Sequence, residues 1–346
     1  MNMEVAMKMA INKVIMVLLA GFATIAIMAC SKSTVTKKVI NGVEYDVIKL
    51  ITPSTGSVST FKIAEWKGYF VEARIYPDYQ GSLDSAKAVA SVLAGKIDVG
   101  GAHVNRTIAA ISNGAKVTAV VAQSETTPRY PHMTFAVLKD SPYKSAKDLV
   151  GLKYGTTAYG GCMEYTPYDQ LRLNAKVPDP KNALGGIVIV PSGQEIATLR
   201  AHQADFISLS TNPDYTFSHE KDLRLFFIDF DVWGTIGGAT PLYFSDEFIK
   251  NNPDTVRRFV KAIAKANNFI DDNVDEAQEL TAKFYKIPKE KTTIMHYARD
   301  GIIKDDSIQI WIDTLNYYKE IKPGIVTSQI YTNAYNEFAK SKTAQK

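Results

Sequence analysis

The stretch Ala94-Gly95-Lys96-Ile97-Asp98-Val99-Gly100-Gly101 decides the fold, because it reads as a helix end, a tight turn, an aspartate and a short buried strand. The same order of signals returns at Ala201-His202-Gln203-Ala204-Asp205-Phe206. Each copy then runs into a polar segment, at residues 100–105 and 210–214. Chance likeness is the alternative, because turns favour the same few residue types. We interpret the two copies as a weak internal repeat, which indicates two lobes.

Outward from these copies, strand and helix signals alternate, as is typical of an α/β fold with mainly parallel sheets. Helices are predicted over residues 59–66 and 82–93 and up to Ile111. Beyond Ser245 the chain is predicted to be helical, with Asn252 as N-cap and Pro253 at the first helical position. The predicted strands are residues 47–51, 73–79, 97–101, 117–122, 134–138, 153–156, 186–190 and 206–209.

The first thirty residues carry the pattern of an export signal. Lys8 and Lys13 precede an apolar run, residues 14–29, that ends at Ala29-Cys30. A basic start, an apolar run and a small residue before the cleavage point are typical of a signal peptide, here residues 1–29. The pattern resembles the lipobox of bacterial lipoproteins, which implies lipid on Cys30 and an extracytoplasmic, membrane-anchored location. The alternative is an uncleaved transmembrane helix, since the run is about as long as a short span.

After Cys30 the chain is polar and rich in Ser, Thr and Lys up to Asn41. This composition predicts a flexible tether, with the lipidated cysteine, over residues 30–45. The alternative is an N-terminal hairpin, because Asn41-Gly42 lies between apolar residues.

Composition narrows the class of protein. The 346 residues are 46% hydrophobic, enough for two cores, and the net charge of +4 falls to +3 once residues 1–29, with Lys8, Lys13 and Glu4, are removed. This balance excludes a nucleic-acid binder. Cys30 and Cys162 are the only cysteines, which excludes a disulfide framework and a four-cysteine zinc or iron–sulfur site. We expect no cofactor and no metal, because the spacing of the histidines matches no metal site.

Four segments in a consistent order resemble the solute-binding proteins of bacterial ABC uptake transporters, of the nitrate, sulfonate and taurine type. They are residues 63–70 (Ile-Ala-Glu-Trp-Lys-Gly-Tyr-Phe), 93–99, 140–153 and 248–256. The resemblance implies the two-lobed type II fold of periplasmic binding proteins, with two crossover strands and closure driven by ligand. Lobe 1 is then residues 46–134 and 235–346, lobe 2 is residues 135–234, and the hinges fall near 124–134 and 231–240.

Ligands of open α/β sheets bind beyond the carboxyl ends of the strands, where helix N-termini offer free N–H groups. Polar loops follow the predicted strands at these points, although simple helix capping is the alternative for each loop. Residues 156–162 are the most distinctive, since two glycines let the backbone approach a ligand. The candidate ligand-binding residues are Ser57, Thr60, Gln80, His103, Thr157, Tyr159, Gly161, Cys162, Asn212 and Trp233.

Other side chains have two interpretations each. Trp233 is expected to form a lid, or else to be a buried tryptophan between the lobes. Tyr165 and Tyr168 face either the cleft or the core. Arg106 and Arg129 are suited to binding an oxyanion, although surface ion pairing is the more common role.

The predicted function is a lipid-anchored receptor, monomeric, that captures a small organic solute and presents it to a membrane permease without chemistry. The solute class is a sulfonate or taurine, an aromatic acid or a pyrimidine-like compound. One alternative is a biosynthetic enzyme of the thiamine-pyrimidine type, although that family carries a cysteine-rich iron motif that this chain lacks. A serine hydrolase is disfavoured because there is no G-x-S-x-G motif. The other alternative is a ligand-sensing domain without transport.

Overall fold

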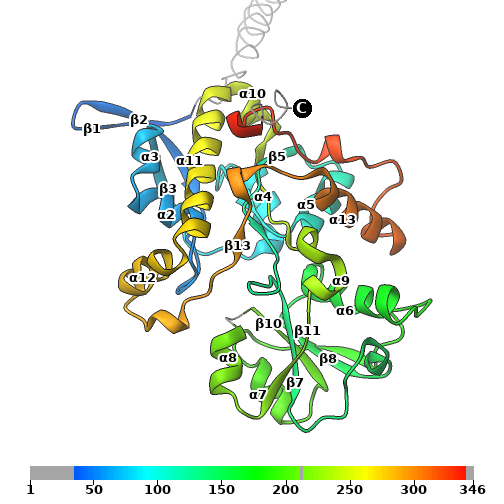
Figure 1. Cartoon of the computed structure of the whole chain (residues 1–346). Helices are drawn as coiled ribbons and strands as arrows, with labels where there is room; N and C mark the ends of the chain where they lie inside the picture. The colour runs from blue at the N-terminus through cyan, green and yellow to red at the C-terminus, as the bar shows by residue number, and fades with distance from the viewer. Residues whose placement is uncertain (1–34, 211–212, 340–346) are drawn as a thin grey trace, which may run out of the picture. The chain divides into compact units, whose positions relative to one another are not determined.

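The computed structural model describes residues 35–210 and 213–339. Its strands are β1 (Lys37–Ile40), β2 (Val43–Leu50), β3 (Ile75–Tyr79), β4 (Gly100–Gly101), β5 (Val117–Val121), β6 (Ser124–Glu125), β7 (Thr134–Leu138), β8 (Lys153–Thr156), β9 (Gly186–Ile189), β10 (Phe206–Leu209), β11 (Leu223–Ile228), β12 (Leu242–Ser245) and β13 (His296–Tyr297) (Figure 1). Its helices are α2 (Thr60–Trp66), α3 (Tyr69–Glu72), α4 (Ala88–Leu93), α5 (Val104–Ser112), α6 (Cys162–Asp169), α7 (Glu195–Arg200), α8 (Pro213–His219), α9 (Phe230–Trp233), α10 (Asp246–Asn251), α11 (Pro253–Asp272), α12 (Val274–Tyr285) and α13 (Asp305–Tyr317).

The sheets are mixed. One sheet has the order β11-β7-β10-β8-β9, in which β8 is parallel to β9 and β10, whereas β7 is antiparallel to β10 and β11. A second sheet places β12 between β4 and β5, antiparallel to both. The predicted α/β class is confirmed, but the prediction of mainly parallel sheets is wrong. The reason is that β7 and β12 enter their sheets after the chain has crossed over, and so run against their neighbours.

The internal repeat is present in the structure as the same backbone clamp at two places. The Asp98 carboxylate accepts a hydrogen bond from Lys49 N (2.7 Å), and Asp98 N donates to Lys49 O (2.9 Å). The Asp205 carboxylate accepts from Lys153 N, and Asp205 N donates to Lys153 O, both at 2.8 Å. Each aspartate thus holds the turn after a helix to a neighbouring strand, which gives the two copies a common physical role.

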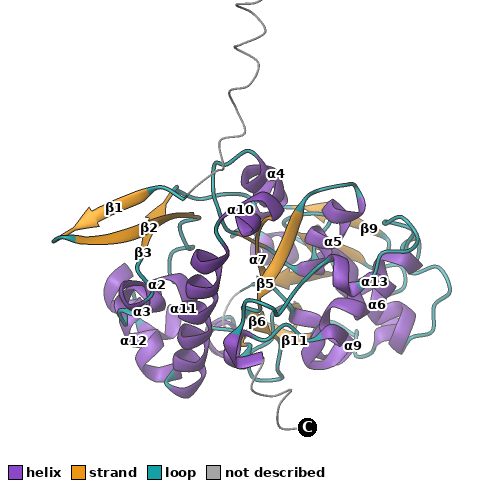
Figure 2. Ribbon diagram, turned by 90° about the horizontal axis from the view of Figure 1, so that it is seen from above, coloured by secondary structure: helices purple, strands orange, loops and turns teal. Residues whose placement is uncertain are grey.

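The chain from Lys37 to Leu50 forms a hairpin, which was the alternative to a flexible tether. Asn41 and Gly42 have φ values of 51° and 76°, the left-handed conformation that a two-residue turn between twisted strands requires. Figure 2 shows that β1 and β2 project beyond the neighbouring helices. Residues 1–34, with the predicted signal peptide and Cys30, lie outside the described residues.

Helix α11 follows the predicted pattern, with Pro253 in its first turn and one buried face that includes Val256, Phe259 and Ile263. Buried Asp46 ties this helix to the hairpin. Its carboxylate accepts hydrogen bonds from Thr255 and Arg258 on α11 and from Lys37 on β1. The charge of Asp46 is therefore compensated from both sides, and the hairpin is fixed to α11.

Replacement of Asp46 by alanine is expected to lower the free energy of unfolding by about 2 kcal/mol, because it removes the buried acceptor of Thr255, Arg258 and Lys37, while both cations keep access to solvent. Denaturant titration measures the effect. The matched control is Glu337→Ala, which breaks a half-exposed pair with Lys261 and is expected to change stability by less than about 1 kcal/mol. Equal losses in the two variants would contradict the assignment.

Two segments carry the chain between the sheets, residues 124–133 and 229–241, and they lie side by side. Ser124 N donates to Thr240 Oγ1 (3.1 Å), and Thr126 N donates to Thr235 O (3.4 Å). A Cβ atom on Gly238 would lie 2.8 Å from Thr126 Cβ, so the approach needs a glycine. These segments coincide with the predicted hinges. The hinge function and the lobe boundaries stay predictions, because the described residues form one compact unit.

Candidate functional site

A cavity of about 410 Å³ lies between the five-stranded sheet and the sheet that contains β12. Its volume is within the range of pockets for small organic molecules. The lining comes from segments far apart in the sequence, within residues 51–61, 83–85, 101–106, 123–133, 161–163, 210, 240–242 and 293–297.

The lining combines apolar walls with hydroxyl groups and one charge. Phe61, Leu83, Met163 and Leu242 are among the apolar residues, and the hydroxyl groups come from Ser54, Ser57, Ser59, Ser85, Ser124, Ser210, Thr240, Thr293 and Tyr297. Among the described lining residues, Arg106 alone carries a charge at neutral pH, and none is an acid. The cavity is therefore electropositive and partly apolar, which suits an organic anion.

Arg106 is held at the cavity by the loop before α6. Its Nη2 donates a hydrogen bond to the Tyr159 carbonyl oxygen (2.8 Å). A Cβ atom on Gly161 would lie 3.0 Å from the same Nη2, so the glycine lets the guanidinium lie against the backbone. Within the described part of the chain no acid forms an ion pair with Arg106, which leaves guanidinium N–H groups for a bound anion.

Four of the sequence-predicted site residues line this cavity: Ser57, His103, Gly161 and Cys162. Thr60 lies directly behind it and accepts a hydrogen bond from the lining residue Gln123 (2.9 Å). The structure thus brings these five residues together from segments that are far apart in the sequence. Whether each binds ligand stays a prediction.

Four other predicted residues lie elsewhere, and Asn212 is outside the described residues. Gln80 is exposed after β3, and the Thr157 hydroxyl points to Met163 Sδ (3.5 Å). Tyr159 has an exposed fraction of 52%, and only its backbone carbonyl approaches the site, through Arg106. Trp233 is buried, which agrees with the expectation of a buried tryptophan and not with that of a lid.

Trp233 forms part of the wall behind the cavity. Its ring lies 4.5 Å from that of Trp311, centroid to centroid, and Trp311 Nε1 donates to the Gly237 carbonyl oxygen (2.9 Å). His103 Nε2 lies 2.9 Å from the same oxygen. Tyr165 and Tyr168 are likewise buried in the core. The rings of Tyr165, Tyr168 and Trp233 therefore serve packing and do not form the cavity surface.

The sequence did not point to several lining residues. His132 and Met133 come from a crossover segment, and residues 293–297 come from the segment after α12 that ends in β13. None has a local signature, because only the fold brings these segments to the strand ends. Arg106 was a candidate for binding an oxyanion. The signal that could have placed it in the cavity is its position at the start of α5, three residues after His103.

Burial controls the charge state of three lining groups. It lowers the pKa of His103 to about 3 and that of His132 to about 4, and the neighbouring His132 adds to the effect on His103. It also raises the pKa of the Cys162 thiol to about 12. At neutral pH both imidazoles are neutral and the thiol keeps its proton. Cys162 is therefore not an activated thiolate nucleophile.

Asp229 lies buried where the two crossover segments meet the five-stranded sheet. Its Oδ1 accepts hydrogen bonds from Thr126 Oγ1 (3.0 Å) and Met133 N (3.1 Å), whereas its Oδ2 is buried with no hydrogen-bond partner among the described residues. Burial raises the pKa of this carboxyl to about 7, above its ordinary value near 4.

The raised pKa of Asp229 predicts a pH-dependent stability. The folded protein binds the proton more tightly than the unfolded chain, so the free energy of unfolding falls as pH rises from about 4 to 7. Asp229→Asn removes this ionisation and keeps an oxygen acceptor. Denaturant unfolding at pH 5, 6, 7 and 8 is expected to show wild type losing a few kcal/mol relative to the variant, at roughly 1.4 kcal/mol per pKa unit. Parallel pH curves would contradict the assignment.

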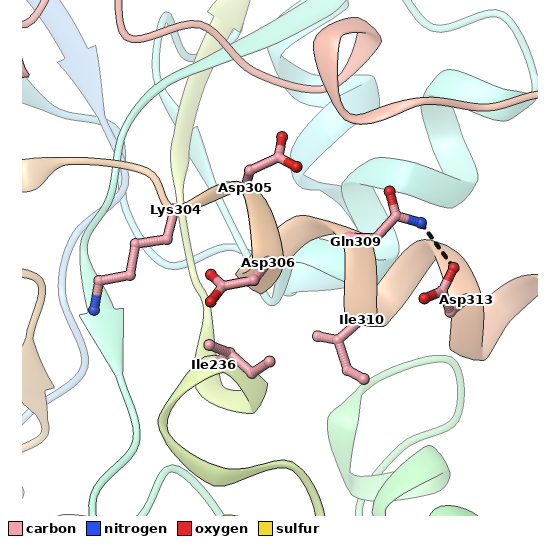
Figure 3. A pocket seen from close by; sticks show the side chains of 7 residues that line it. All are labelled: Ile236, Lys304, Asp305, Asp306, Gln309, Ile310 and Asp313. Atoms are coloured by element: carbon pink, nitrogen blue, oxygen red, sulfur yellow. Dashed lines mark hydrogen bonds between the residues drawn. The ribbon is translucent and has the colours of Figure 1, made fainter. Parts of the chain in front are cut away.

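A second hollow lies at the surface beside the start of α13. It is lined by Ile236, Lys304, Asp305, Asp306, Gln309, Ile310 and Asp313, and Figure 3 shows the Gln309 amide donating to Asp313. None of the predicted site residues lines it. Its charged groups are mostly acidic, and Lys304 pairs with Glu125 (2.6 Å). The first cavity is therefore the candidate site.

Comparison with solved structures shows the fold of periplasmic binding proteins. The alkanesulfonate-binding protein SsuA of Xanthomonas axonopodis pv. citri, solved with MOPS, is 14% identical, with 83% of this chain and 98% of that chain covered and a TM-score of 0.64. The aliphatic sulphonate binding protein SsuA of Escherichia coli is 13% identical (82% and 91% covered, TM-score 0.65). The nitrate-binding protein NrtA of Synechocystis PCC 6803 is 12% identical (86% and 88% covered, TM-score 0.64).

Two further findings bear on the class of protein. No curated protein sequence matches the chain. Among the described residues, no helix combines the length and the apolar character needed to cross a membrane. The family model described as "NMT1/THI5 like" matches residues 57–277, a stretch that includes most of the cavity lining, both crossover segments and the whole five-stranded sheet. The chain therefore belongs to the NMT1/THI5-like family.

Proposed function

We propose that the protein is an extracytoplasmic receptor of an ABC uptake transporter, which captures a small organic anion in the cavity between the sheets. The observation that carries the proposal is Arg106, an unpaired cation in a cavity whose other described lining residues are neutral. Sulfonates and carboxylates match the guanidinium, because both present oxygens that accept two of its N–H groups. The apolar walls provide for the organic part of the solute.

Binding is favoured over catalysis by the same lining. The family also includes biosynthetic members, so an enzyme is the competing function. The described cavity residues include no carboxylate for general acid or base chemistry, and the buried Cys162 thiol is protonated at neutral pH. Two neighbours with a similar fold are named as binding proteins, one for alkanesulfonates and one for nitrate. We therefore assign capture of the solute, as a monomer, followed by delivery to a membrane permease.

The test is ligand-induced stabilisation of the protein after unfolding and refolding to remove any carried solute. Alkyl- and arylsulfonates, taurine and aromatic carboxylates are compared with the corresponding neutral amides. An anion at a hundred times its Kd is expected to stabilise the protein by about 2.7 kcal/mol, visible as a shift in Tm. Stabilisation by the amides alone, or by none of the anions, would overturn the proposal.

Arg106→Gln is expected to weaken binding of the stabilising anion by about 10- to 100-fold, the value of a charge-assisted hydrogen bond pair in a partly buried site. Calorimetric titration measures the change. Arg129→Gln is the matched control, because Arg129 is an exposed arginine outside the cavity. An unchanged affinity in the Arg106 variant, or an equal loss in both variants, would remove Arg106 from the site.

Lipid anchoring is proposed from the Ala29-Cys30 pattern. Cys30→Ser is expected to move the protein from the membrane fraction to the soluble fraction and to leave solute affinity unchanged, because the cavity is built from residues 51–297. Fractionation of cells with immunodetection measures the first effect, and titration of the released protein measures the second. A variant that stays with the membrane would contradict acylation at this cysteine.

A further inference from the structure

Three side chains with strong metal-binding character meet in the cavity. His103 precedes α5, His132 lies in the first crossover segment and Cys162 begins α6. One potential ligand atom from each lies within 4.8 Å of the other two. Consecutive members of the cluster are about thirty positions apart in the chain, so no local spacing reveals them, and only the fold forms the cluster.

One ring nitrogen of His103 is held by a backbone carbonyl. A neutral imidazole has one N–H, and the Gly237 carbonyl oxygen, 2.9 Å from Nε2, can only accept a hydrogen bond. The hydrogen is therefore on Nε2, and Nδ1 keeps its lone pair. Donation of the second ring N–H to a backbone carbonyl fixes the ring of a metal ligand in the same way.

The lone pair on His103 Nδ1 faces another acceptor. Asn105 Oδ1 lies 3.2 Å away, while Asn105 Nδ2 donates to the Gly160 carbonyl oxygen (3.3 Å). If the Asn105 amide were flipped, Nδ2 could donate to His103 Nδ1. Oδ1 would then face the Gly160 carbonyl oxygen, so one pair of acceptors would still be in contact. A cation beside Nδ1 changes this contact between two lone pairs into an attraction.

His132 supplies an independent observation. Its Nδ1 is buried and has no hydrogen-bond partner among the described residues. An unsatisfied buried nitrogen destabilises the folded state, so such groups are rare without a ligand or water. The His132 ring lies 5.2 Å from the His103 ring, centroid to centroid, and both residues line the cavity.

Cys162 defines the class of metal. It is a buried free cysteine, and thiolate with two imidazoles suits zinc or copper, whereas calcium and magnesium prefer oxygen ligands. Three protein ligands leave one position of a tetrahedral zinc site open. Arg106 opposes a bare cation here, and loss of the thiol proton to solvent, as the metal–sulfur bond forms, offsets one positive charge.

We propose that His103, His132 and Cys162 form a site for a divalent transition metal of the zinc class, with its open position toward the cavity. The anionic head of the solute occupies that position and contacts Arg106 at the same time. This second step rests on the proposed function, whereas metal binding does not. No redox change occurs: the metal exchanges a water molecule for the solute oxygen.

The metal site is tested with Co²⁺ and Zn²⁺ alone, on protein reduced and freed of metal by chelation. Co²⁺ is expected to bind at one per chain with the near-ultraviolet absorption of a thiolate–cobalt bond, and Zn²⁺ is expected to abolish that absorption. Cys162→Ser should remove the absorption, and His132→Gln should weaken binding on the order of tenfold or more. His219→Gln, on the exposed side of α8, is the matched control and should leave binding unchanged.

Circular dichroism and Tm show whether each variant is folded. If Cys162→Ser or His132→Gln does not fold, His132→Asn is used in its place in the metal-binding test. Absence of the thiolate–cobalt absorption in wild type, or equal binding by wild type and both cluster variants, would overturn the site. Solute titration with and without chelator separates the two proposals. Metal binding without any solute response would overturn the receptor function, and equal solute affinity with and without metal would overturn the shared contact.

Discussion

The wall of the cavity depends on one buried carboxylate, that of Asp169. It has no exposed surface and accepts hydrogen bonds from Arg172, Trp233 Nε1 (2.9 Å), Thr314 Oγ1 (3.0 Å) and Tyr318 OH (2.8 Å). A buried charge is stable only when its acceptors are satisfied, so α6, α9 and α13 must meet at this point. Trp233 then packs on Trp311, and Trp311 shares the Gly237 oxygen with His103.

The charge and polarity of the cavity come from the residues that line it in front of this wall. The five-stranded sheet contributes Gly161, Cys162 and Ser210 from loops at its strand ends, and the opposite sheets contribute Ser57, Arg106 and Leu242. Neutral imidazoles and a neutral thiol lie next to a permanent guanidinium charge. Electrostatic attraction in such a partly dry site is stronger than at the surface, and it selects for anions.

Much of the fold could be predicted from the sequence. The bounds of β7, β8 and β10 agree with the predicted strands, because each is a short apolar run between turn residues. Strands β11 and β12 were missed, since they lie beside the crossover where helix and strand signals mix. The strand-end loops were the right place to look for the cavity, whereas His132 and Gln123 depend on tertiary contacts that no local pattern records. Trp233 shows the limit: a tryptophan among glycines predicts a lid as well as a core residue.

The two crossover segments have a mechanical consequence. Hydrogen bonds join the two segments, from Ser124 to Thr240 and from Thr126 to Thr235. The segments therefore form one paired connection and not two independent ones. Two segments that are bonded side by side resist twisting and sliding past each other, but they can bend together. The pairing therefore predicts that relative motion of the two sheets is a single rotation, with the mouth of the cavity opening along one edge.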